Sequence, residues 1–129
     1  MAKKIILSIT FALLLCGCGD SPAPETPVAK PATIEFNKGV DFADKEDWDT
    51  AIACFSEAIR LDPDYGYAYY HRGSAYHEKG EYDAAIKDYT EAIRPKPEDV
   101  DYHMRRGLAY RLMGEYDKAI QDHTEVIRL

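Results

Sequence analysis

The sequence predicts an all-α protein made of three tandem helix–turn–helix repeats that form a short solenoid. One observation is a fixed step of 34 residues, which separates Gly39, Gly73 and Gly107. Another is that residues 73–94 and 107–128 are identical at 14 of 22 positions. A constant period of this length is the pattern of stacked helical units.

Each repeat is predicted to hold two helices. In the second repeat these are residues 67–79 and 83–94, separated by Gly80, a residue type that often follows a helix end. Apolar residues recur at steps of three and four in the second helix of each repeat, which gives one apolar stripe. Pro63 and Pro97 then separate the repeats.

Three positions depart from this repeat pattern. Glu46 stands where the later repeats have a glycine between their helices. Pro95 lies in the last turn of a predicted helix and should end that helix early. His123 replaces the aromatic residue that the earlier repeats have at Phe55 and Tyr89.

Over residues 32–65, 66–99 and 100–129 the sequence resembles the tetratricopeptide repeat family. The match includes the small residue of the first helix, an aromatic residue three positions later, the alanine and aromatic of the second helix, and the closing proline. The resemblance implies a right-handed superhelix that binds a peptide or protein on its concave face. The third repeat has no closing proline or cap, so we expect one face of residues 117–129 to lie bare.

In this family the first helix of each repeat lines the binding groove. The groove residues that this implies are Phe36, Tyr67, Tyr70, His71, Ser74, Met104, Arg105 and Leu108. Their apolar members would bury side chains of a partner and their polar members would form hydrogen bonds. The alternative is that they line a solvated surface and pack on their neighbours. Five other tyrosines fall on packing positions of the repeat: Tyr76, Tyr82, Tyr89, Tyr110 and Tyr116.

One subset of the family grips the C-terminal carboxylate of chaperone peptides with two lysines, two asparagines and an arginine. The matching positions here are Phe36, Val40, His71, Asp101 and Arg105. Only Arg105 agrees with that pattern, and Asp101 would repel a carboxylate. The resemblance therefore does not extend to this carboxylate clamp.

The sequence gives no indication of catalysis or of a cofactor. A formal charge of −7 argues against nucleic acid as a partner, because phosphate binding needs a basic surface. His71 and His77 are six residues apart and do not share a helical face, so we expect no metal site. Cys54 has no partner cysteine in the repeats and is predicted to be a small buried residue. We expect a protein that is not an enzyme.

Residues 1–17 are predicted to be a bacterial lipoprotein signal peptide. Two lysines precede the apolar residues 5–15, a segment too short to span a bilayer. Residues 15–18, Leu-Cys-Gly-Cys, resemble a lipobox that is cleaved before Cys18, which places the acyl chains on Cys18. Cys16 would leave with the signal peptide. The alternatives are an ordinary signal peptide or a buried apolar helix.

Residues 18–33 are predicted to be the lipidated cysteine and an extended tether. This segment holds four prolines and few apolar residues, so it cannot form a core. Gly19 follows the cysteine, whereas aspartate at that place tends to hold lipoproteins of this type in the inner membrane. The resemblance therefore indicates the outer membrane, with the repeat domain, residues 34–129, facing the periplasm.

The leading hypothesis from the sequence is a membrane-anchored adaptor that binds a protein or peptide segment of the cell envelope. An alternative is a structural homo-oligomer assembled through the uncapped third repeat. A third hypothesis is an accessory subunit of an enzyme.

Overall fold

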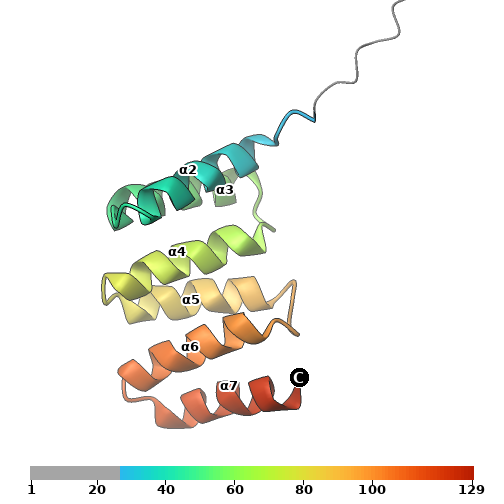
Figure 1. The fold of residues 1–129 in the computed structure, drawn as a ribbon. Helices are drawn as coiled ribbons and strands as arrows, with labels where there is room; N and C mark the ends of the chain where they lie inside the picture. The colour runs from blue at the N-terminus through green and yellow to red at the C-terminus, as the bar shows by residue number, and fades with distance from the viewer. Residues whose placement is uncertain (1–26) are drawn as a thin grey trace, which may run out of the picture.

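The computed structural model describes residues 27–129, and this part of the chain folds into helices joined by short turns. The helices are α2 (Pro31–Ala43), α3 (Trp48–Leu61), α4 (Gly66–Glu78), α5 (Tyr82–Ile93), α6 (Val100–Leu112) and α7 (Tyr116–Arg128). They form three antiparallel pairs stacked in chain order, from α2 at one end to α7 at the other (Figure 1). The predicted all-α repeat fold is confirmed. The predicted signal peptide and Cys18 lie outside the described residues.

The two helices of each pair approach closely at a glycine. A Cβ atom on Gly39 of α2 would lie 2.5 Å from Cε1 of Phe55 in α3, which is too close for any side chain. At Gly73 of α4 the corresponding distance, to Cε1 of Tyr89 in α5, is 3.0 Å. Phe55 and Tyr89 are fully buried as a result, and they form the centre of the first two repeats.

A buried ion pair joins α4 to α5. Arg72 donates through Nε and Nη2 to the two carboxylate oxygens of Asp88, at 2.7 and 2.8 Å. Arg72 also donates through Nη1 to the Ser56 hydroxyl of α3, at 3.0 Å, and so links the second repeat to the first. Because Asp88 is buried, loss of its partner would leave an unpaired charge in the protein interior, at a cost of about 3–5 kcal/mol.

The same arrangement recurs one repeat later. Arg106 donates to both oxygens of the buried Asp122, at 2.9 and 2.6 Å, and to the Thr90 hydroxyl of the preceding repeat, at 3.1 Å. The corresponding positions in the first repeat are Lys38 and Cys54. The pair α2–α3 therefore lacks this buried link.

The turn between the helices of each pair requires a left-handed backbone conformation. Gly80 and Gly114 have φ values of 77° and 80° in the second and third repeats. Glu46 occupies the same place in the first repeat with φ 59°. A residue with a Cβ atom is strained there by roughly 1–2 kcal/mol.

Pro95 shortens α5, as the sequence predicts. α5 ends at Ile93, whereas α3 continues to Leu61, which is the residue in register with Pro95. The proline ring cannot continue the helical hydrogen bonding, so the second repeat closes two residues earlier than the first.

The tyrosines predicted to pack do so with one exception. Tyr89 is fully buried, and Tyr76, Tyr82 and Tyr110 are half-buried. Tyr116 is 64% exposed, so it does not pack within the described residues. Its counterpart Tyr82 packs against a core cluster that includes a residue of α6, whereas no helix follows α7 within residues 27–129.

One face of α7 is exposed in the described part of the chain. Ile120 is 62% exposed and Ile127 is 86% exposed. Cys54, which was expected to be buried, is half-buried on α3, and burial is the largest cause of its raised thiol pKa.

Replacing Glu46 with glycine is expected to raise the free energy of unfolding by about 1 kcal/mol. Glycine adopts the left-handed conformation without the Cβ clash, although its greater freedom in the unfolded chain offsets part of the gain. Urea denaturation followed by circular dichroism measures the change. Glu46→Ala is the matched control, because it removes the carboxylate and keeps Cβ. If Glu46→Ala stabilises the protein equally, the backbone explanation is wrong.

Candidate protein-binding groove

The first helices of the three pairs form the inner row of the solenoid. α4 contacts both α2 and α6, whereas the described parts of α3, α5 and α7 make no contact with one another. In a curved stack the row whose members touch is the concave one. All eight predicted groove residues lie on α2, α4 and α6, which alternate with α3, α5 and α7 along the stack (Figure 1). Their role in binding remains a prediction.

Aromatic rings join these helices across the inner row. The Phe36 ring of α2 meets the His71 ring of α4 edge-on, with centroids 5.1 Å apart, and also packs on Tyr65 at 5.1 Å. His71 in turn meets Tyr70 edge-on at 5.4 Å, and Tyr70 packs on Tyr102 of α6 at 4.9 Å. We call Phe36, His71, Tyr70 and Tyr102 the aromatic row. Such ring pairs stabilise by about 0.5–1.5 kcal/mol each, so the row fixes the groove surface.

Sequence reasoning missed Tyr102 as a member of this row. Tyr102 is buried, and its hydroxyl has no hydrogen-bond partner among the described residues. Burial raises its pKa to about 12. In the repeat register it stands at the position of Ala68, so the pattern assigned it no aromatic role.

Ser74 links the aromatic row to the buried Tyr89 through hydrogen bonds. Its hydroxyl donates to the backbone oxygen of Tyr70, at 3.1 Å, and accepts from the Tyr89 hydroxyl, at 3.3 Å. Burial raises the pKa of Tyr89 to about 12, so its phenol stays protonated and keeps donating at neutral pH. Ser74 has therefore used its one donor within the protein, which leaves it little to offer a partner.

The remaining predicted groove residues are accessible. Tyr67 is 49% exposed, its hydroxyl accepts a hydrogen bond from Lys96 at 3.1 Å, and the Lys96 ammonium lies 4.6 Å from its ring centre. Met104 is 45% exposed, Arg105 is exposed and Leu108 is half-buried. An apolar patch with two positive charges, Lys96 and Arg105, thus borders the aromatic row.

The two histidines of α4 are shifted towards the neutral form. Burial lowers the pKa of His71, which packs among aromatic rings. Burial also lowers the pKa of His77, whose Nδ1 is buried without a partner among the described residues. At neutral pH the centre of the inner row is therefore aromatic and uncharged.

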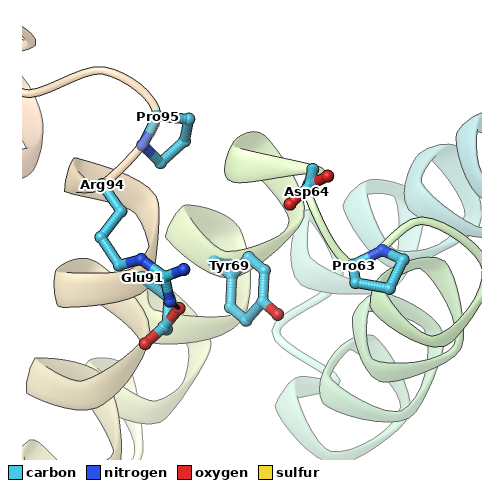
Figure 2. A pocket seen from close by; sticks show the side chains of 6 residues that line it. All are labelled: Pro63, Asp64, Tyr69, Glu91, Arg94 and Pro95. Atoms are coloured by element: carbon cyan, nitrogen blue, oxygen red, sulfur yellow. Dashed lines mark hydrogen bonds and ion pairs between the residues drawn. The ribbon is translucent and has the colours of Figure 1, made fainter.

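A separate pocket of about 420 Å³ lies at the turns between repeats. Figure 2 shows its lining of Pro63, Asp64, Tyr69, Glu91, Arg94 and Pro95. It contains none of the predicted groove residues. Arg94 and Glu91 form an ion pair of 2.6 Å on its wall, so the pocket presents paired charges.

The described residues do not meet the requirements of a metal site or of a membrane-spanning helix. No group of three histidine, cysteine, aspartate or glutamate side chains is placed to hold a metal ion within residues 27–129. None of the described helices has the length and apolar character that crossing a membrane requires.

The described part of the chain has the features of a helical-repeat protein. Its helices are paired, a glycine meets an aromatic ring in each of the first two pairs, and the first helices of the pairs form one inner row. The family model described as tetratricopeptide repeat matches residues 36–100 and 78–127. The chain belongs to the tetratricopeptide repeat family. No protein of curated function matches the sequence.

Several solved structures share the fold. The second repeat domain of Spaghetti (RPAP3), bound to the HSP90 peptide SRMEEVD, is 30% identical with a TM-score of 0.73, over 76% of this chain and 91% of that one. MamA is 29% identical with a TM-score of 0.75, over 77% of this chain and 58% of that one. The TPR2B domain of yeast Sti1 in its pHsp70 complex is 25% identical with a TM-score of 0.71, over 74% and 76% of the two chains.

Protonation of His71 is expected to destabilise the fold. Because its pKa is lower in the folded than in the unfolded chain, the unfolded state binds more protons at mildly acidic pH. The free energy of unfolding should therefore fall as the pH drops below the ordinary histidine pKa of about 6.5. Urea denaturation at about pH 7.5 and about pH 5 measures this loss.

His71→Phe keeps an aromatic ring and removes the titrating group. The loss of stability on acidification should be smaller in this variant than in the wild type, with the remainder coming from groups such as His77. An equal loss in both proteins would contradict the assignment to His71.

Proposed function

We propose that this protein is an adaptor that binds a segment of another protein in the groove of α2, α4 and α6. The observation that carries the proposal is the aromatic row bordered by the exposed Tyr67 and Met104. Rigid aromatic side chains provide contact area at low entropic cost, and aromatic and arginine residues are frequent anchors in interfaces. Two similar solved structures are complexes with chaperone partners, which supports protein binding as the general role.

The chemistry of the groove favours a segment with apolar or aromatic side chains over a terminal carboxylate. Phe36 and His71 occupy two of the positions at which the chaperone-binding subset has its clamp residues. They pack edge-on against each other, and burial shifts His71 towards the uncharged form. Asp101 adds an exposed carboxylate near the start of α6. Arg105 offers a positive charge to an acidic group of the partner, and the Lys96 ammonium lies beside Tyr67.

Photocrosslinking in the native envelope tests the groove. A photoreactive residue at Met104, on the inner row, should capture a specific protein. The same residue at Lys87, exposed on α5, should not capture it. Adding Arg105→Glu should lower the capture at Met104 at least about tenfold, as expected for an interface anchor.

Lys87→Glu is the matched charge reversal outside the groove, and it should leave the capture unchanged. Circular dichroism establishes that each variant is folded. Capture at Met104 that is insensitive to Arg105→Glu and equal to that at Lys87 would sink the groove proposal.

We also propose that acyl chains on Cys18 hold the adaptor at the outer membrane, facing the periplasm. The apolar segment, the lipobox-like residues 15–18 and Gly19 support this. Lipid must provide the attachment, because the chain without residues 1–17 has a formal charge of −9 and an anionic bilayer would repel it. Several acyl chains bind a bilayer far more firmly than one.

Cys18→Ser is expected to release the protein from the membrane fraction and to abolish incorporation of labelled palmitate. Cys16→Ser is the matched control, because Cys16 would be removed with the signal peptide. Separation of inner and outer membranes then gives the location. Palmitate labelling that survives Cys18→Ser would contradict the anchor site.

A second candidate function is a structural homo-oligomer. The exposed apolar side chains of α7 favour it, since large exposed apolar patches mark interaction surfaces.

A further inference from the structure

The bare face of α7 has covered counterparts in both earlier repeats. We call Tyr116, Ile120, Thr124 and Ile127 the α7 face, and all four are exposed. The residues in register on α5 are half-buried next to α6: Tyr82, Ile86, Thr90 and Ile93. Those on α3 are half-buried next to α4: Trp48, Ile52, Ser56 and Ile59. The α7 face is therefore shaped to receive a first helix of this repeat type.

One polar link recurs at each covered junction. The hydroxyls of Ser56 and Thr90 accept from Arg72 and Arg106 of the next repeat, at 3.0 and 3.1 Å. Thr124 is oriented in the same way, because its hydroxyl donates to the backbone oxygen four residues earlier, as those of Ser56 and Thr90 do. Its acceptor position faces no basic side chain among the described residues. The expected occupant carries a cation at this place.

A second link crosses the first junction. The Lys79 ammonium lies 2.6 Å from a carboxylate oxygen of Asp49. Asp117 of α7 is in register with Asp49 and forms no ion pair within residues 27–129. This link is present at the first covered junction and not at the second, where Met113 is in register with Lys79. An occupant that resembles α4 would carry a second cation seven residues after the first, because Arg72 and Lys79 are seven residues apart.

α2 and the turn that follows it carry both cations in this register. Lys38 is in register with Arg72, and Lys45 is in register with Lys79. Within residues 27–129 the only ion pair of Lys38 is with Glu35 of its own helix, because Cys54 stands where the later repeats have a buried aspartate. Lys45 forms no ion pair in the described part of the chain and lies 5.5 Å from the Phe42 ring centre.

The apolar residues of α2 also fit this place. Phe42 is in register with Tyr76, a half-buried side chain at the covered junctions. Ile34 is an exposed apolar side chain in register with Ala68 and Tyr102. Since both a small and a large residue are buried there in the later repeats, isoleucine falls within the tolerated range.

We propose that the α7 face binds α2 of a second copy of this chain, head to tail. Lys45 of the second copy pairs with Asp117, and Lys38 of the second copy donates to Thr124. The two surfaces are different, so the contact is heterologous and can continue from copy to copy. This inference rests on the second candidate function and gives it a geometry; it does not depend on the groove.

Sedimentation of the full chain in detergent micelles tests the proposal. The wild type should show concentration-dependent species larger than one chain. Asp117→Lys and Lys45→Asp should each weaken the association at least about tenfold, because each places like charges opposite one another. Mixing the two variants should restore it, since the introduced lysine of one copy then meets the introduced aspartate of the other. Ile120→Lys should abolish association, whereas Lys87→Glu on the outer surface of α5 should not affect it.

Two results would overturn the proposal. A wild-type chain that stays single at every concentration excludes self-association altogether. Association that depends on Asp117 and Ile120 but not on Lys45 shows that α7 pairs with itself or another surface, which excludes the head-to-tail contact and leaves the oligomer hypothesis. Neither result bears on capture at Met104.

Discussion

The fold depends on the glycine at which the two helices of each repeat meet. At Gly39 and Gly73 the partner helix presents an aromatic ring where a side chain would otherwise stand. The ring is buried because the glycine has no Cβ, and the helices approach because the ring fills the space. This contact sets the shape of one repeat. The Arg72 and Arg106 links then fix each repeat against the one before it, so that the whole stack keeps a single register.

The groove is rigid because the repeats that form it are stacked in a single register. Tyr70 packs on the buried Tyr89, and Tyr102 of the next repeat packs on Tyr70. Packing on buried residues thus fixes these aromatic side chains, and a partner would meet a surface that is already ordered. Preorganisation of this kind lowers the entropic cost of binding. The same packing keeps His71 among uncharged neighbours, which explains why a carboxylate clamp and this groove are chemically different sites built on one fold.

The backbone effects of single residues could be predicted from the sequence, whereas the burial of individual polar side chains could not. Glu46 and Pro95 break the repeat pattern, and each has the backbone consequence that its residue type dictates. The Arg72–Asp88 pair was missed because a charged residue indicates a solvated surface unless its partner is known, although both members recur at the step of 34. Tyr102 was missed because it replaces an alanine in register, and only the neighbouring ring of Tyr70 shows that the larger side chain is accommodated.

Cys54 has a mechanical consequence. It stands where the later repeats have a buried aspartate, so α2 is joined to α3 by apolar packing without a buried ion pair. A pull on the N-terminal side of α2 would act first on this pair. Separating α2 from α3 under such a pull breaks no buried ion pair, whereas separating α4 from α5 or α6 from α7 breaks one in each case.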